Sequence, residues 1–236
     1  MAGNGNLPAG RSSPNEIAAF LRQLETVPRK ASGRRGRLMF AMDATASRQP
    51  TWDQACHLQG EMFDAAAALG GLDVQLVFFR GYGECLAAPW LASASELSRR
   101  MTGVTCLAGK TQWCRVLSHA IAETGRTRVN ALVAVGDSME ESMDPLGDLA
   151  GQLGVLGVPV FLFQEGDDPA TRDAFQQVAR LSRGAWCRFD ASSARQLKDL
   201  LSAVAVFAAG GPAALQTFGR KQGGAVRLLT DQMARP

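Results

Sequence analysis

The sequence predicts an α/β protein with a Rossmann-like, doubly wound and mainly parallel sheet, helices on both faces and one short antiparallel edge strand. Between residues 37 and 209, short and continuously apolar runs alternate with longer segments of helical periodicity. Continuous apolar runs are typical of strands that are buried on both faces. Their alternation with helices implies right-handed crossovers and a covered parallel sheet. A composition of 46% apolar and 20% charged residues allows a core of ordinary size.

Each element follows from this pattern in chain order. Strands are expected at 37–43, 72–79, 129–135, 158–163 and 184–190, and the edge strand at 85–92, where Pro89 is tolerable because an edge need not donate every N–H. Helices are expected from a cap at Thr51 to Leu69, and at 93–101, 112–124, 145–153, 171–182 and 192–209.

The chain divides into three predicted parts. Residues 1–35 form an N-terminal extension, in which a capping box at Ser13–Glu16 begins a short amphipathic helix that precedes a basic linker. Residues 36–208 form the α/β domain. Residues 209–236 form a C-terminal tail, in which glycine and proline residues indicate a linker before a short amphipathic end.

Composition and charge exclude several classes. The net charge of +3 is concentrated in the basic run at residues 29–37, which we interpret as a solvated linker, so we expect no nucleic-acid partner. No run approaches the ~20 apolar residues that span a bilayer. The N-terminus lacks the apolar core of a signal peptide, and the cysteines form neither a CxxC pair nor a zinc pattern. We therefore expect a cytoplasmic protein with reduced thiols.

The segment AGKT at residues 108–111 looks like the end of a phosphate-binding P-loop. A P-loop requires a glycine five residues before Gly109, where Val104 stands, and it must directly follow a buried strand. The preceding segment, 96–101, has a helical pattern instead. We therefore do not expect nucleotide hydrolysis.

Three oxygen-bearing side chains follow the first predicted strand. Asp43, Thr45 and Ser47 lie at alternate positions where this strand runs into a loop. In an open α/β sheet, ligands bind in the crevice at the carboxyl ends of the strands. Carboxylate and hydroxyl oxygens suit Mg²⁺, Mn²⁺ or Ca²⁺ rather than zinc. One loop cannot complete the shell, so Thr111 and Asp137, which ends another strand, are the candidates to complete it.

The segments MDATAS (residues 42–47), GKT (109–111) and GDS (136–138) resemble the three loops of a von Willebrand factor A (VWA) domain. The resemblance covers roughly residues 36–208. In that family a D-x-S-x-S motif, a later threonine and a later aspartate form the metal-ion-dependent adhesion site (MIDAS). Carried over to this sequence, the resemblance implies that the metal site consists of Asp43, Thr45, Ser47, Thr111 and Asp137.

The resemblance also implies a role for each residue. The hydroxyls of Thr45 and Ser47 bind the ion directly, Thr111 joins directly or through water, and Asp43 and Asp137 act largely through water. Thr45 replaces the usual serine; its hydroxyl takes the same place, although the methyl group restricts the rotamer. Two carboxylates against a divalent ion leave the site near neutral and one oxygen short, and an Asp or Glu of a partner completes the shell.

Structural roles for these residues remain open at this point. Asp43, Ser47 and Asp137 could cap the helices that follow them, and Thr111 could be an N-cap. Three further side chains, Ser138, Glu140 and Glu141, could line the rim of the site or begin a helix. Both histidines, His57 and His119, lie in predicted helices and are expected to be solvated or half-packed rather than catalytic.

Three functions are compatible with these patterns. The first is a metal-dependent protein-interaction module, and the VWA resemblance implies an adaptor role in a larger cytoplasmic complex of a bacterial type, with an AAA+ ATPase among the possible partners. The second is a structural scaffold with a vestigial metal site. The third is a metal-dependent phosphohydrolase with Asp43 as nucleophile, but such enzymes usually carry an acid where Thr45 stands. We therefore expect no catalytic residues.

Overall fold

A computed structural model describes residues 35–67, 69–189, 194–222 and 224–233 of the chain. These residues belong to one compact unit that begins at Arg35. The predicted N-terminal helix and the basic linker up to residue 34 lie outside the described residues. The division of the chain at residues 36 and 209 remains a prediction.

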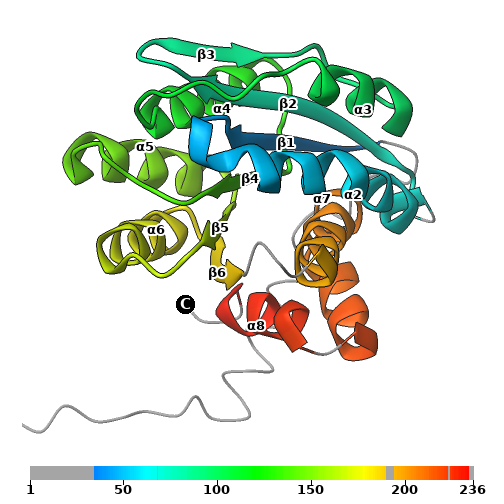
Figure 1. Cartoon of the computed structure of the whole chain (residues 1–236). Helices are drawn as coiled ribbons and strands as arrows, with labels where there is room; N and C mark the ends of the chain where they lie inside the picture. Colours follow the sequence, from blue (N-terminus) through cyan, green and yellow to red (C-terminus); the bar gives the residue numbers. More distant parts are fainter. Residues whose placement is uncertain (1–34, 68, 190–193, 223, 234–236) are drawn as a thin grey trace, which may run out of the picture. The chain divides into compact units, whose positions relative to one another are not determined.

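The described residues form a six-stranded sheet with the order β3-β2-β1-β4-β5-β6. Every neighbouring pair is parallel except β2 and β3, so the predicted doubly wound sheet with one short antiparallel edge strand is confirmed (Figure 1). The strands are β1 (Gly36–Asp43), β2 (Leu72–Arg80), β3 (Glu84–Ala87), β4 (Ala131–Gly136), β5 (Val160–Glu165) and β6 (Ala185–Phe189).

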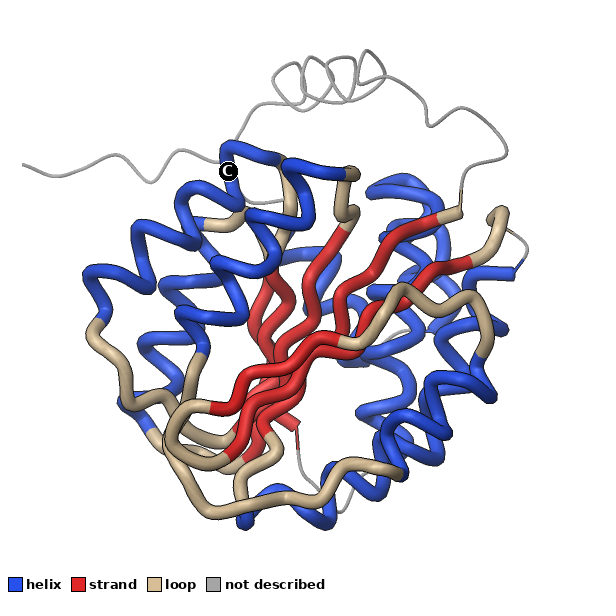
Figure 2. Tube along the Cα trace, turned by 90° about the horizontal axis from the view of Figure 1, so that it is seen from above, coloured by secondary structure: helices blue, strands red, loops and turns tan. Residues whose placement is uncertain are grey.

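Helices cover both faces of this sheet (Figure 2). One hydrophobic cluster joins the sheet to α2, α3, α7 and α8, and a second joins it to α4, α5 and α6. The described helices are α2 (Gln49–Ala67), α3 (Ala94–Thr102), α4 (Trp113–Arg126), α5 (Met143–Leu156), α6 (Pro169–Leu181), α7 (Ala194–Gln222) and α8 (Gly224–Met233), with a 3₁₀ turn η1 (Ala46–Arg48) before α2.

Strand β1 shows why the apolar runs are continuous. Leu38, Phe40 and Met42 belong to the first cluster, whereas Met39 and Ala41 belong to the second, and all are fully buried. Successive side chains of a strand point to opposite faces, so a strand with helices on both sides needs an apolar residue at every position.

The predicted helix cap at Thr51 is wrong. Helix α2 begins two residues earlier, at Gln49, and Pro50 fits its first turn because an N–H there has no intrahelical partner. Thr51 is buried and its hydroxyl donates a hydrogen bond to the carboxylate of Glu165 at the end of β5. In the sequence, a threonine near the start of a helical pattern looks like an N-cap even when its hydroxyl bonds to a residue at the end of a strand.

The linker predicted after residue 209 is also wrong. The segment is helical to Gln222, and Gly211, with a φ of 75°, together with Pro212 produces a kink rather than an end. Leu215 in the second half of α7 is buried, and α8 lies against β6. The Gln232 side chain accepts a hydrogen bond from the Trp186 N–H and donates one to its carbonyl, which pairs part of the open edge of β6.

One described helix segment, Lys198–Arg220, is long and apolar enough to cross a membrane when judged by length and composition alone. The expectation that no segment approaches this length therefore needs correction. In the fold, 61% of the apolar window is buried, and positions 200 to 209 pack against the sheet. A core helix that is covered on most sides has the same composition as a membrane span.

Candidate metal centre

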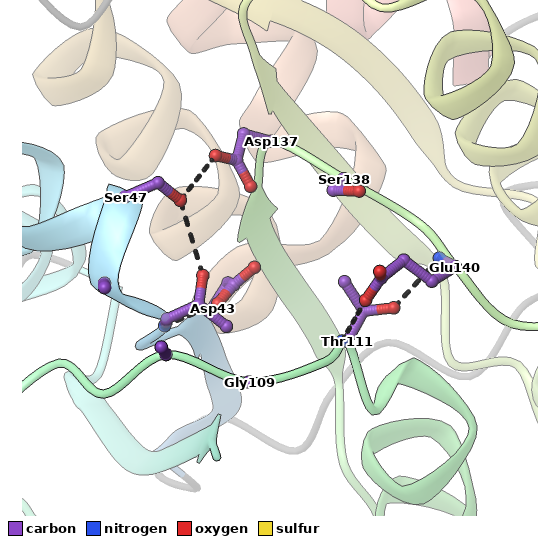
Figure 3. A pocket seen from close by; sticks show the side chains of 10 residues that line it. Asp43, Ser47, Gly109, Thr111, Asp137, Ser138 and Glu140 are labelled. Atoms are coloured by element: carbon purple, nitrogen blue, oxygen red, sulfur yellow. Dashed lines mark hydrogen bonds between the residues drawn. The ribbon is translucent and has the colours of Figure 1, made fainter. Parts of the chain in front are cut away.

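The five predicted metal ligands line one cavity at the carboxyl ends of β1 and β4. These two strands are neighbours, with Met42 opposite Val135, so the loops that follow them begin side by side. The cavity has a volume of about 290 Å³ and is open to solvent on one side. Figure 3 shows the side chains that line it. It is lined by Asp43, Thr45, Ala46, Ser47, Ala108, Gly109, Thr111, Asp137, Ser138 and Glu140.

Asp43, the last residue of β1, is almost completely buried, with 1% of its surface exposed. One carboxylate oxygen, Oδ1, accepts a hydrogen bond of 2.7 Å from the Thr45 N–H. The other oxygen, Oδ2, is buried and has no hydrogen-bond partner in the part of the chain that the structure describes. Burial raises the pKa of Asp43 to about 6; hydrogen bonds from Thr45 oppose this rise, the Asp137 charge adds to it, and the Arg48 charge opposes it.

Ser47 links the first loop to Asp137. Its hydroxyl donates a hydrogen bond of 2.9 Å to Oδ2 of Asp137, and Figure 3 shows the two side chains pointing toward one another. The hydroxyl oxygen of Thr45 lies 3.5 Å from that of Ser47. Because Asp137 takes the Ser47 hydrogen, the lone pairs of the Ser47 oxygen remain available to a ligand in the cavity.

Thr111 lies in the same cavity but is bound by two acidic residues. Its hydroxyl donates to Glu141 and accepts a hydrogen bond of 2.9 Å from the Glu140 N–H. Its own N–H donates to the Glu140 carboxylate at 3.0 Å, and Figure 3 shows these two side chains together. Glu141 also accepts a hydrogen bond of 3.2 Å from the Cys114 N–H in the first turn of α4. Of the acids considered for the rim, Glu140 lines the cavity and Glu141 caps α4.

The structure adds Arg48, which sequence reasoning missed. Its side chain is 1% exposed and forms an ion pair with Glu165, and it lies 3.9 Å from Oδ2 of Asp137. Its Nε and Nη2 atoms are buried without a partner. A permanent positive charge therefore lies beneath the cavity beside Asp137. The only available signal was its position directly after DATAS, and an arginine there is ordinarily assumed to be solvated.

Two glycines bring the loops together. A Cβ atom on Gly109 would lie 2.0 Å from the Gly81 carbonyl oxygen, and one on Gly136 would lie 2.5 Å from the Trp113 ring. The N–H of Lys110 donates to that same Gly81 oxygen at 3.0 Å. The glycine of the AGKT segment therefore serves close packing between loops. The element before this loop is helix α3, whereas a P-loop would follow a buried strand.

The capping alternative does not account for these side chains. In the described part of the chain, the N-cap positions of η1, α4 and α5 make no side-chain capping hydrogen bond. The hydroxyls of Ser47 and Thr111 bond to acidic side chains instead. His119 is half-buried beside the Gln75 amide, which is 3.0 Å away, and burial lowers its pKa, while His57 is exposed on α2. Neither histidine lines this cavity.

The donor set fits a hard divalent cation. The cavity offers carboxylate and hydroxyl oxygens, and Oδ2 of Asp43 is an acceptor that the protein leaves unsatisfied. No group of three or more His, Cys, Asp or Glu side chains arranged for a metal occurs among the described residues, so the site depends on its hydroxyls. Buried polar atoms normally have partners, and an unpaired carboxylate oxygen in a cavity lined by hydroxyl groups fits a positively charged ligand.

Several solved structures with a similar fold are named as VWA domains. The VWA domain of SpRpn10 matches with a TM-score of 0.56 at 13% identity, over 71% of this chain and 94% of that one. A von Willebrand factor type A protein from Catenulispora acidiphila matches with a TM-score of 0.58 at 13% identity, over 71% of this chain and 42% of that one.

A third match carries a metal. Proximal thread matrix protein 1 from the mussel byssus, in a structure with a zinc-occupied MIDAS motif, matches with a TM-score of 0.56 at 13% identity, over 83% of this chain and 53% of that one. No protein-family model matches this chain, and no curated protein matches its sequence. At these identities the likeness concerns the fold alone.

Proposed function

We propose that this chain, which has the fold of the von Willebrand factor A domains, is a protein-interaction module that holds a divalent cation and captures an acidic side chain of a partner. The single observation that carries the proposal is the buried Oδ2 atom of Asp43, which has no hydrogen-bond partner among the described residues, in a cavity that Thr45, Ser47 and Thr111 also line. A structural aspartate would have its second oxygen satisfied by the protein.

Each residue of the cavity has a separate role in the proposed metal site. Thr45 and Ser47 would hold the ion through hydroxyl oxygens, and Asp137 would orient Ser47 by accepting its hydrogen. The N–H of Thr45 fixes the Asp43 carboxylate through Oδ1, and its second oxygen, Oδ2, would be available to the ion. A bound divalent cation would supply a positive position with room for one more oxygen ligand. The open side of the cavity gives a partner's Asp or Glu access to it.

We propose Mg²⁺ as the ion, with Mn²⁺ and Ca²⁺ as alternatives of the same chemistry. The all-oxygen donor set supports a hard cation. The zinc in the MIDAS of the mussel protein supports divalent binding in this fold in general. We further propose that the module acts as an adaptor in a larger cytoplasmic complex, where an AAA+ ATPase is one partner of suitable type. This part rests on the VWA resemblance.

Calorimetric titration with Mg²⁺ and Mn²⁺ tests the proposal. Wild type is expected to bind in the presence of excess acetate, which stands in for the partner's carboxylate, and to gain thermal stability. Asp43→Ala is expected to lose both effects. Asp148→Ala, which removes an exposed carboxylate of α5 outside the cavity, is the matched control and is expected to behave as wild type. Equal binding by all three proteins would exclude the site, and absence of binding would favour a scaffold.

A further inference from the structure

We infer that the turn between β2 and β3 and the neighbouring loop 105–110 form a second recognition surface beside the metal cavity, which binds an apolar side chain next to the partner's acidic residue. This inference rests on the proposed function, because the cation anchors the same partner. Its central residue is Tyr82, the single tyrosine of the chain, and its flanks are Leu107, Lys110 and Arg115.

The turn is adjacent to the cavity wall. Gly109 lines the cavity, and the backbone of Gly81 lies directly against it, too close for a Cβ atom. Tyr82 follows Gly81 in the chain. The N–H of Leu107 donates to the Ala44 carbonyl at 3.0 Å, which joins the same loop to the end of β1. The two exposed side chains therefore belong to segments that form the edge of the cation site.

The turn is also held in place by several side chains. Arg80 forms a two-point ion pair with Glu84 across the turn, with both distances 2.9 Å, and donates to the Thr105 carbonyl at 2.7 Å. Arg115 donates to the Gly83 carbonyl at 2.6 Å, and the buried Gln112 amide faces the carbonyl oxygens of the turn. A preorganised surface loses little conformational entropy when a partner binds.

Tyr82 and Leu107 nevertheless point into solvent. Tyr82 is 82% exposed and contributes little to the fold by burial, and Leu107 keeps 45% of its surface exposed. A tyrosine on a rigid turn is the type of residue that carries binding energy in interfaces, because it adds a large contact area with few rotatable bonds. The fold holds the backbone of this turn in place and leaves the ring in solvent.

The charge around the ring selects an acidic partner. Neither Lys110 nor Arg115 forms an ion pair with another described residue. Both belong to the segment that carries Thr111. The Lys110 backbone and the Arg115 side chain both bond to the turn that carries Tyr82, and their charges favour a peptide segment in which an Asp or Glu is adjacent to an aromatic or aliphatic residue. The carboxylate would reach the cation site, and the apolar side chain would cover Tyr82 and Leu107.

A displayed peptide library with one fixed aspartate between random residues tests this assignment. The library is selected on wild type with Mg²⁺, and enriched peptides are synthesised for affinity measurement. Apolar residues are expected next to the aspartate. Tyr82→Ala is expected to weaken these peptides about fivefold to tenfold, as loss of one aromatic contact would. Val155→Ala removes a side chain that is 87% exposed at the end of α5 and is expected to change nothing.

The outcomes separate the two proposals. If chelation abolishes binding but the enriched peptides show no apolar preference, or if Tyr82→Ala binds them as wild type does, the second surface is excluded and the cation site stands. If no selected peptide depends on Mg²⁺ or on Asp43, the proposed function fails and the inference fails with it. A matched peptide with asparagine in place of the fixed aspartate is expected to lose binding to wild type and to Tyr82→Ala alike.

Discussion

The two sides of the metal cavity are prepared for a cation to different degrees. On the side of β1, Asp43 has a buried oxygen without a partner, and Ser47 gives its hydrogen to Asp137. On the side of α4, the Thr111 hydroxyl is already bonded to two acidic residues. The unpaired oxygen on the β1 side lowers the stability of the metal-free protein. On the α4 side, the Thr111 hydroxyl both donates and accepts a hydrogen bond, so it must rearrange before it can offer more than one lone pair to an ion. Binding readiness and local stability are therefore opposed within one site.

The largest effect is expected from Arg48, which lies beneath the β1 side. Arg48→Met keeps the volume but removes the charge that pairs with Glu165 and stands beside Asp137. Removing one member of a buried ion pair leaves the other uncompensated, which costs about 3 kcal/mol of unfolding free energy. Urea unfolding of wild type and Arg48→Met measures this difference in the free energy of unfolding.

The matched control for this prediction is Arg172→Met, which breaks an exposed pair with Asp173 and is expected to cost roughly a few tenths of a kcal/mol, as surface ion pairs do. Equal stability of the two variants would show that Arg48 does not support the β1 side, and the contrast between the two sides would lose its electrostatic basis.

The next effect concerns the pH dependence of Asp43 in metal-free protein. Burial raises its pKa to about 6, above the ~3.9 of an unfolded aspartate, so the folded state binds the extra proton between these values. The free energy of unfolding therefore falls as pH rises through this window, by at most about 3 kcal/mol. Asp43→Asn removes the charge and is expected to be more stable than wild type above pH 6 in a chelating buffer, with the difference shrinking toward pH 4.

Thermal unfolding at several pH values, with and without Mg²⁺, checks this prediction. Saturating Mg²⁺ is expected to stabilise wild type and to leave Asp43→Asn nearly unchanged, so that the order of stability reverses. Asp148→Asn is the control for loss of an exposed carboxylate. A wild type that is already the more stable protein in the chelator would show that Asp43 is not the costly group on the β1 side.

The sequence predicts the strands and the strand-end residues of the cavity, but it does not predict the hydrogen-bond and ion-pair partners of the side chains on its two sides. The strands and the positions of Asp43 and Asp137 at strand ends follow from local apolar runs, and the structure confirms the predicted sheet. The partners of Thr111 and Arg48 do not follow. Glu141 is 30 positions from Thr111, and Glu165 is 117 positions from Arg48, so only the tertiary fold brings them together.

The errors at the helix ends have a related cause. Gly211 and Pro212 are the residues that end helices, yet the apolar face continues beyond them and buries Leu215, so packing turns an end into a kink. The Thr51 hydroxyl donates a hydrogen bond to the distant Glu165 carboxylate and does not cap a helix N–H. Sequence rules for helix ends fail where a residue makes a more stabilising contact with a distant part of the fold than with its own neighbours in the chain.

The smallest effect is expected on the α4 side, where Glu141 accepts the Thr111 hydrogen and leaves a lone pair of the hydroxyl available, as Asp137 does for Ser47. Glu141→Ala takes this acceptor away and removes the bond to the Cys114 N–H, so it is expected to cost about 1 kcal/mol of stability and to weaken Mg²⁺ binding about threefold. Glu140→Gln leaves Glu141 on Thr111 but removes a charge that lines the cavity, and it is expected to weaken Mg²⁺ binding. Weaker binding by both variants in calorimetry would identify Glu141 as the residue that orients the Thr111 hydroxyl for the ion. If Glu141→Ala binds Mg²⁺ as well as wild type or better, Glu141 does not position Thr111, and the α4 side takes no part in holding the ion.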